Sequence, residues 1–334
     1  MNRAVQFQTF GGPEVLEMVE AAEPTPGAGE VRVAVKAVGL NPVDSHTFGG
    51  DARLRLVESV QQLIHPNRWF GRGPSRFPRG VARDFAGIVD AVGPDVTGFV
   101  VGDGVLGTLR GAPGLGAKKG ALVEKLVAST GDVVIKPEPL SFEVAASLGV
   151  AAQTASGAFR QLDLNSSDVV VISAASGGVG SLAVQLALHR GATVIGIAGE
   201  HNIDYLRSLG AVPVTHGEGV KSRVLAATPR PVTKLLDCYG GEYVKLGFGL
   251  GLPGRAIGTL VPSPGAIMRG AQFTGSRHAQ PGDLQEVTDL VADGTIKVTL
   301  AHVYPFNAES VRDAYIEQDT GHVRGKLVIS LPEV

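Results

Sequence analysis

The pattern of hydrophobic and polar positions changes about 135 residues into the chain. Before that point, short β-like runs are interrupted by Gly and Pro, as in RAVQF, EVRVAVKAVGL and FAGIVDAVG. After it, the apolar run VVVIS (169–173) precedes the helical run GSLAVQLALHRG, and ATVIGIA precedes the helical run NIDYLRSLG. The first pattern predicts a mostly β domain. The second predicts βαβ units around a parallel sheet.

The later part of the chain completes the expected domains. The alternation continues through VPVT, KSRVLAAT, KLLDCYG, GRAIGTLV and AQFTG, which predicts a doubly wound domain over residues 136–275. The tail reads as a helix (DLQEVTDLVADG), a strand (IKVTLAHVYPF), a helix capped by Asn307 and a last strand, GKLVISL. We assign the tail to the first domain, which then comprises residues 1–135 and 276–334. The expected fold class is α/β.

The segment of residues 51–78 fits neither the β-rich pattern nor the alternating strand–helix pattern. Its apolar positions suit a short amphipathic helix that Pro66 would end. One interpretation is a surface insertion that covers local core. The other is a lid or substrate wall that carries Trp69, the only tryptophan, and Phe70.

Composition narrows the classes of function. The chain has 334 residues, 44% hydrophobic and 19% charged, with a net charge of -2, so it is neither a disordered chain nor a polybasic nucleic-acid binder. We expect a small-molecule ligand and no nucleic-acid partner. The single cysteine, Cys238, excludes an intramolecular disulfide and is typical of a reducing compartment. The sequence shows no signal-peptide pattern and no apolar run of about 18 residues, so we expect a soluble, cytoplasmic protein without a membrane partner.

A glycine turn follows the first strand of the doubly wound domain. In SAASGGVGSLAV (173–184), Ala175, Gly177 and Gly180 occupy the three glycine positions of the dinucleotide fingerprint G-x-G-x-x-G. Gly177 would let the backbone approach a pyrophosphate, and Gly180 would let the helix pack closely on the strand. The helix N-terminus would then supply N–H groups to the anion. The alternative is a turn that only joins strand to helix.

The residues after the next strand bear on the type of dinucleotide. Glu200 could accept a hydrogen bond from the ribose 2′-hydroxyl of NAD, or it could be a solvated turn residue. His201, His216 and Lys221 are candidates for contacting the 2′-phosphate of NADP. These residues alone leave the choice open.

The chain resembles the medium-chain dehydrogenase/reductase superfamily, in particular its zinc-free quinone oxidoreductase branch, which includes zeta-crystallin and enoyl reductases. The matching stretches span nearly the whole chain and occur in the family's order. They are FGGPEVLE (10–17), GLNPVD (39–44), RDFAGIVDAVG (83–93), VGDGVLG (101–107), AASLGVAAQTA (145–155), SAASGGVGSLAVQLA, HNIDYLRSLGA (201–211) and VRGKLVIS (323–330).

The resemblance implies a fold, a site and an activity. It implies a GroES-like β domain completed by the C-terminal segment, together with an inserted Rossmann domain. It places Asn41 and Arg83 where zinc-dependent relatives have a cysteine and a histidine ligand, so we expect no metal. The implied catalytic residues are Asn41, Asp44 and His46. The cofactor-binding residues that we expect are Thr154, Ser176, Gly177, Gly178, Val179, Gly180, Gly199, Glu200, His201 and His216.

The expected reaction is a 1,4-reduction of a quinone or an α,β-unsaturated carbonyl, because the resulting anion is delocalised and hydrogen bonds can stabilise it. Our hypothesis is that His46 or an attached water supplies the proton and that Asn41 orients substrate or ribose. Alternatively, His46 is a loop histidine held by Asp44. The resemblance favours NADP(H), with NAD(H) left open, and a homodimer through the edge strand AQFTG. Two other functions stay open: a redox-neutral biosynthetic step, or a dinucleotide-binding structural or regulatory protein.

Overall fold

The computed structural model describes residues 2–52, 54, 77–109 and 119–332. The proposed lid, including Trp69 and Phe70, lies for the most part outside the described residues. The chain divides into two compact units, one formed by residues 1–149 and 300–334 and the other by residues 150–299.

The first unit is mostly β, as the N-terminal pattern predicts, and most of its described strands pair antiparallel. A three-stranded sheet has the order β2-β1-β4, and a larger sheet has the order β15-β16-β3-β5-β6-β8, with β7 also paired to β3. Only β15 and β16 pair in parallel within this unit's described strands. The strands are β1 (Asn2–Phe7), β2 (Glu17–Ala21), β3 (Glu30–Gly39), β4 (Arg79–Gly80), β5 (Asp84–Val92), β6 (Gly104–Thr108), β7 (Lys125–Ser129), β8 (Val133–Ile135), β15 (Leu300–Pro305) and β16 (Lys326–Ser330).

The burial pattern of β3 shows why the sequence folds in this way. Buried and partly exposed residues alternate along Glu30–Val35 and onward, which is the period of a strand with one face on a core. The core collects aliphatic residues from both ends of the chain together with a small aromatic group. In that group, Phe48 packs edge-on against Phe7 and against Tyr315, at ring-centroid distances of 6.4 and 5.1 Å. N-terminal and C-terminal segments therefore share one core.

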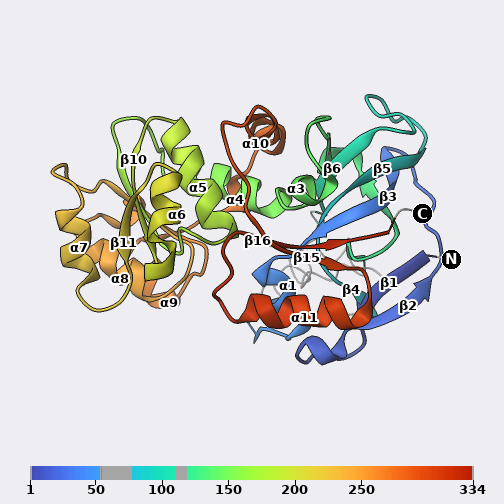
Figure 1. Ribbon diagram of the computed structural model, residues 1–334, viewed down its shortest axis with the longest axis horizontal. Helices are drawn as coiled ribbons and strands as arrows, with labels where there is room; N and C mark the ends of the chain where they lie inside the picture. Colours follow the sequence, from blue (N-terminus) through green and yellow to red (C-terminus); the bar gives the residue numbers. More distant parts are fainter. Residues whose placement is uncertain (1, 53, 55–76, 110–118, 333–334) are drawn as a thin grey trace. The chain divides into compact units, whose positions relative to one another are not determined.

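Three α-helices accompany these strands among the described residues of the first unit. They are α1 (Pro42–Phe48), α3 (Phe142–Ala146) and α11 (Ala308–Asp319). The predicted cap of α11 is confirmed, because the Asn307 side chain accepts a hydrogen bond from the Ser310 N–H at 2.8 Å. Figure 1 shows α11 running beside β15, with which it is in contact.

The second unit is a parallel six-stranded sheet with the order β11-β10-β9-β12-β13-β14. The chain winds from β9 outward to β11 on one side, then returns to the centre and winds from β12 outward to β14. The point of reversal lies between β9 and β12, and in such sheets ligands bind beyond the carboxyl ends of the strands at that point. The strands are β9 (Val169–Ile172), β10 (Thr193–Ala198), β11 (Val212–Thr215), β12 (Lys234–Asp237), β13 (Ile257–Thr259) and β14 (Gln272–Phe273).

Helices pack around this sheet, as the predicted βαβ units require (Figure 1). Helix α5 contacts β9 and β10, α6 and α7 contact β11, and α8 contacts β12 and β13. The helices are α4 (Gly149–Gln161), α5 (Gly178–His189), α6 (Ile203–Ser208), α7 (Val220–Ala226), α8 (Glu242–Gly249), α9 (Pro264–Met268) and α10 (Asp283–Ala292). The expected α/β class, a GroES-like domain with a Rossmann domain, is confirmed.

The boundaries of the two units differ from the expected ones. The structure divides the chain after residues 149 and 299, whereas the expectation placed the divisions after residues 135 and 275. At the first boundary, helix α3 packs on β3 and β5 and therefore belongs to the first unit. At the second, the Asp283 carboxylate of α10 binds the Arg160 guanidinium of α4 at 2.5 and 2.8 Å, which ties α10 to the second unit.

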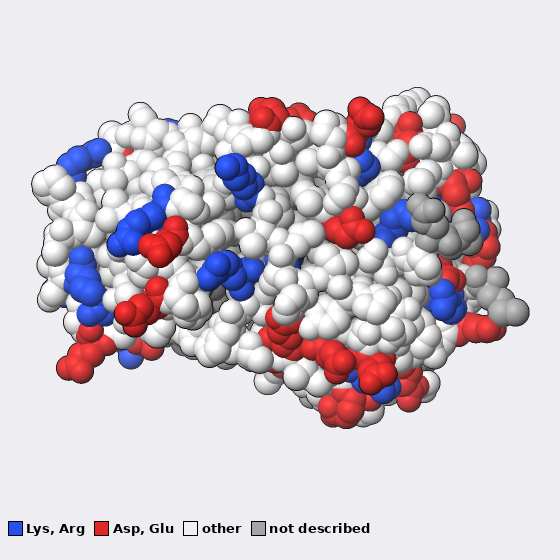
Figure 2. All heavy atoms as spheres, viewed as in Figure 1, with Lys and Arg blue, Asp and Glu red and all other residues white. Residues whose placement is uncertain are grey.

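The surface carries charges of both signs. On the face in Figure 2, basic and acidic side chains are interspersed, in agreement with the near-zero net charge. Within the described part of the chain, no helix combines the length and the apolarity needed to cross a bilayer.

Candidate functional site

The glycine turn lies where strand β9 meets helix α5. Helix α5 starts at Gly178, with Gly177 as its N-cap residue in an extended conformation (φ -79°, ψ 179°). The first N–H groups of an α-helix have no partner within the helix, and here they are those of Gly178, Val179 and Gly180. These N–H groups face the region beyond the carboxyl end of the sheet, next to the reversal point. The positive end of the dipole of this 12-residue helix lies at the same place.

The two glycines of the fingerprint have different surroundings. A Cβ atom on Gly180 would lie 2.1 Å from the Ala174 carbonyl oxygen, so only glycine lets α5 approach the turn this closely. A Cβ atom on Gly177 would meet only that same oxygen, at 3.4 Å, so the fold itself does not require glycine there. Glycine at 177 leaves the backbone bare on the side of the helix N-terminus, which is the space that a diphosphate needs.

Alanine replaces the first glycine of the fingerprint without strain at that position. Ala175 does not adopt positive φ; the left-handed residue of the turn is its neighbour Ala174, at φ 45°. The Ala175 side chain is fully buried. Because the turn places its left-handed conformation one residue earlier, an alanine methyl is accepted at position 175.

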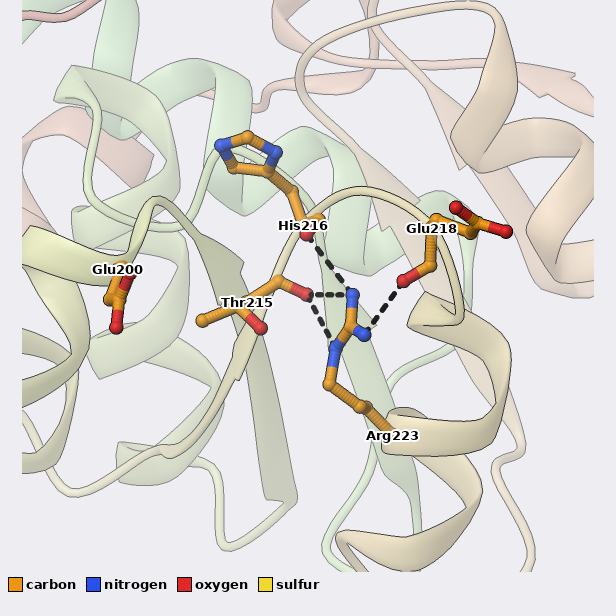
Figure 3. Close-up of a pocket in the computed structure, with 5 residues that line it drawn as sticks. All are labelled: Glu200, Thr215, His216, Glu218 and Arg223. Atoms are coloured by element: carbon orange, nitrogen blue, oxygen red, sulfur yellow. Dashed lines mark hydrogen bonds between the residues drawn. The ribbon is translucent and has the colours of Figure 1, made fainter.

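A pocket of about 410 Å³ opens beyond the carboxyl ends of β10 and β11 (Figure 3). Arg223 holds the loop that follows β11, because its guanidinium donates to the carbonyl oxygens of four successive residues at 2.7–3.3 Å. Glu200 and His216 were both expected at the cofactor, and both line this pocket. The residues that line it are Glu200, Thr215, His216, Glu218 and Arg223.

The other expected cofactor residues lie at separate places in the second unit. His201 is exposed, its Nε2 atom lies 3.1 Å from Asn202 Nδ2, and its ring folds over Gly199. Ser176 is 8% exposed within the glycine turn. Thr154 is buried on α4 close to Gly275, where an added Cβ would lie 3.4 Å from the Thr154 methyl group. Their contacts with a cofactor stay predictions.

A buried polar cluster surrounds Asn41 in the first unit. Asn41 is the N-cap residue of α1 and is 2% exposed. Its Nδ2 donates to Asp84 Oδ2 at 2.9 Å, and its Oδ1 accepts from Lys326 Nζ at 2.7 Å. Both polar atoms of the amide are thus engaged within the unit. The expected contact of Asn41 with substrate or ribose stays a prediction.

Lys326 is the member of this cluster that sequence reasoning missed. It is 5% exposed on β16, and its Nζ also donates to the Leu40 carbonyl oxygen at 2.8 Å and lies 3.9 Å from Asp84 Oδ2. Burial lowers the pKa of this ammonium group, and the nearby carboxylates oppose that shift. The only signal in the sequence was its position in the stretch VRGKLVIS, since 285 residues separate it from Asn41.

Asp44 lies on the first turn of α1 and is 1% exposed. Its Oδ2 atom accepts from the Asn41 backbone N–H at 2.9 Å and from the Tyr315 hydroxyl at 3.5 Å. Burial raises the pKa of Asp44 to about 7, outweighing the opposing effects of the Arg83 guanidinium and the Asn41 N–H group. Among the described residues, no hydrogen-bond partner reaches Asp44 Oδ1 or the buried Nε of Arg83.

His46 lies apart from this cluster. Its side chain is 62% exposed, and its Nδ1 atom lies 3.7 Å from Asp51 Oδ2. The alternative in which Asp44 holds His46 is therefore wrong: the acidic partner is Asp51, because the Asp44 carboxylate faces the unit's interior. The predicted role of His46 in proton supply stays a prediction.

The residues at the expected metal positions are poor ligands. The Asn41 amide is engaged by Lys326 and Asp84, and a guanidinium such as that of Arg83 has no lone pair to offer a metal. Over the ranges that the structure describes, no group of three or more His, Cys, Asp or Glu side chains is placed to hold a metal ion.

Comparison with known proteins assigns a family model to each of the two units. Residues 27–138 match the family model described as alcohol dehydrogenase GroES-like domain, and residues 150–329 match that described as zinc-binding dehydrogenase. The chloroplast envelope quinone oxidoreductase homolog of Arabidopsis thaliana is 30% identical over 98% of each chain. A mitochondrial NAD(P)H oxidoreductase of Danio rerio is 27% identical over 91% of this chain and 84% of its own. The solved quinone oxidoreductase of Coxiella burnetii superposes with a TM-score of 0.81, at 30% identity and 99% coverage of both chains.

These matches cover both units. The chain belongs to the medium-chain dehydrogenase/reductase superfamily and, within it, to the quinone oxidoreductase branch. It is an oxidoreductase, and its family depends on a nicotinamide dinucleotide. The bare backbone at Gly177 and the N–H groups at the start of α5 fit the diphosphate of such a cofactor.

Substitution of the two fingerprint glycines separates folding from binding. Gly180→Ala will lower the free energy of unfolding by about 2–3 kcal/mol, because the new methyl group collides with a backbone carbonyl. Gly177→Ala will change that free energy by less than about 0.5 kcal/mol but will weaken dinucleotide binding at least about 10-fold. Urea unfolding and calorimetric titration with NADPH and NADH measure the two effects. Unchanged binding by Gly177→Ala would contradict the assigned diphosphate site.

Asp44 makes stability depend on pH. Its folded-state pKa of about 7 exceeds the unfolded value of about 3.9, so between these values the folded chain binds the additional proton. The stability of the wild-type protein relative to Asp44→Asn will therefore fall as the pH rises from about 4 to about 7, by at most about 4 kcal/mol, and then level off. Urea unfolding of both proteins across this range measures the difference. A difference that is constant with pH would show that Asp44 titrates normally.

Proposed function

We propose that the protein is an NADPH-dependent, metal-free reductase that transfers a hydride to a quinone or an α,β-unsaturated carbonyl. The observation that carries the proposal is the bare glycine turn at the N-terminus of α5, in a chain that belongs to the quinone oxidoreductase branch. The relatives named quinone oxidoreductases support a quinone as substrate.

In this proposal the second unit binds the coenzyme and the first unit supplies a proton. In the second unit, the amides of Gly178–Gly180 would hold the diphosphate. The bound coenzyme supplies the hydride. Hydride addition to a quinone or enone leaves negative charge on oxygen, and one proton completes the product. In the first unit, we assign that proton to His46, whose exposed imidazole can be reprotonated from water.

The proposed absence of a metal rests on the substrate as well as on the residues. A quinone or enone spreads the added charge over a conjugated system, so the reaction needs less polarisation than reduction of a simple carbonyl. The side chains at positions 41 and 83 are an amide already engaged in hydrogen bonds and a guanidinium. Hydrogen bonding and fixed positive charge would then stabilise the anion.

An assay of NADPH oxidation at 340 nm against a panel of quinones and enones tests the proposed activity. We expect turnover with at least one of these classes that withstands EDTA, and a loss of about 10–100-fold in kcat for His46→Ala with unchanged NADPH affinity. His322→Ala, at an exposed histidine of the same unit, is the matched control and will leave turnover unchanged. NADPH binding without consumption across the panel would instead favour the structural or redox-neutral alternatives.

We propose NADP(H) rather than NAD(H) as the preferred coenzyme. The pocket in Figure 3 supports this choice through the fixed positive charge of Arg223 and through Thr215 and His216, which could contact a 2′-phosphate. Glu200 lines the same pocket, and its carboxylate would accept a hydrogen bond from a ribose 2′-hydroxyl and repel a phosphate.

Dissociation constants of NADPH and NADH show whether the positive charge of Arg223 or the negative charge of Glu200 dominates the choice of coenzyme. We expect the wild-type protein to bind NADPH more tightly than NADH. Glu200→Ser will widen that preference about 10-fold, since it removes the repulsion, and His216→Ala will weaken NADPH binding alone. Tighter binding of NADH by the wild-type protein would reverse our choice of coenzyme.

We also propose that the protein is a cytoplasmic homodimer joined through the edge strand β14. The edge is short and bordered by exposed apolar side chains, including Met268 at 88%, Ile267 at 43% and Phe273 at 37% exposure. Unpaired strand edges of this kind pair readily across a two-fold axis. Light scattering should give twice the chain mass, and Met268→Asp combined with Phe273→Arg should give a monomer. Val100→Asp, at another exposed apolar residue, should stay dimeric; a wild-type monomer would refute the proposal.

A further inference from the structure

The loop after β12 lies at the same reversal point as the glycine turn. Strands β9 and β12 are neighbours at the centre of the sheet, and their carboxyl ends lead into the turn at residues 173–177 and the loop at residues 238–241. A hydrogen bond of 2.8 Å from Ser173 Oγ to Asp237 Oδ1 joins the glycine turn to the end of β12. Both loops therefore border the place where a dinucleotide binds in a sheet of this topology.

Asp237 fixes the backbone of this loop. The side chain is fully buried, and Oδ1 also accepts from the Tyr239 and Gly240 N–H groups at 3.0 and 2.9 Å. Its Oδ2 accepts from Thr259 Oγ1 at 2.8 Å, and Ser173 Oγ in turn accepts from the Cys238 N–H at 2.9 Å. A buried carboxylate with four donors is a strong anchor, so the loop is held from strands on both sides of β12.

This anchored loop presents an aromatic ring to solvent. The Tyr239 side chain is 64% exposed, although its own backbone N–H is bound to the buried carboxylate. The ring packs edge-on against Tyr243 at the start of α8, at a centroid distance of 5.8 Å and an interplanar angle of 89°. An exposed aromatic on a fixed backbone loses little conformational freedom when it binds a planar ligand.

We propose that Tyr239 packs against the nicotinamide ring of the bound coenzyme. A doubly wound sheet binds one mononucleotide half of a dinucleotide on each side of the reversal point. The pocket lined by Glu200 and His216 lies at the β10–β11 side and would take the adenosine half. The loop after β12 lies on the other side, which leaves the nicotinamide half to Tyr239. This inference rests on the proposed dinucleotide function.

A comparison of ligands with and without the nicotinamide ring tests the inference. The probes are NADPH and 2′-phospho-ADP-ribose, titrated by calorimetry into the full chain. Tyr239→Ala should weaken NADPH binding about 10-fold, the usual effect of removing an aromatic that stacks on a planar ring, and change binding of the probe without nicotinamide less than about twofold. Tyr239→Phe should keep the wild-type affinities for both ligands, because the ring face is retained.

Control variants separate this contact from general damage to the loop. Leu225→Ala removes another exposed apolar side chain in the same unit, 55% exposed on α7, and should leave both affinities unchanged. Tyr239→Leu keeps the bulk of the residue without its ring face and should lose NADPH affinity as Tyr239→Ala does, which provides a second test if the alanine variant does not fold.

Two results would overturn the inference. One is an equal loss of affinity for both probes in the Tyr239 variants, and the other is no loss for either. Failure of the proposed function has a different signature, because the wild-type protein would then bind neither NADPH nor NADH.

Discussion

The close approach of helix α5 to the end of strand β9 is the constraint on which the second unit depends. A side chain at Gly180 would lie 2.1 Å from a backbone oxygen, so the helix reaches this position only with glycine. That approach aims three N–H groups without helical partners at one point beyond the sheet. The packing thus places these donors where the diphosphate of the proposed coenzyme could accept hydrogen bonds from them.

Two buried aspartates, Asp237 and Asp44, differ in the number of hydrogen-bond donors that surround their carboxylates. Asp237 accepts hydrogen bonds from four donors and anchors a loop between strands. Asp44 is equally buried, yet no donor reaches its Oδ1 among the described residues, and its pKa rises to about 7. Hydrogen bonds compensate for lost hydration in the first case and only in part in the second. Asp237 therefore anchors a loop through its hydrogen bonds, whereas burial raises the pKa of Asp44.

Distant segments of the chain meet in the first unit around the start of α1. Lys326 from the last strand binds Asn41, and Tyr315 from α11 reaches Asp44. Because a buried ammonium and buried carboxylates need partners, these contacts hold the two ends of the chain in one arrangement. Helix α1 is thus linked to α11 in two ways, by the hydrogen bond from Tyr315 to Asp44 and by the ring contact between Phe48 and Tyr315. Phe7 of β1 packs on the same Phe48 ring.

The sequence by itself determined the alternation of strands and helices along the second unit, the glycine turn and the Asn307 cap, because each depends on local periodicity or on neighbours a few residues apart. It placed the unit boundaries imperfectly, since the Arg160–Asp283 pair that holds α10 joins residues 123 apart. Only the tertiary structure decided that Asp51 rather than Asp44 accompanies His46, that Lys326 engages Asn41 and that Asp237 presents Tyr239. The orientation and burial of these side chains depend on elements that meet only when the chain has folded.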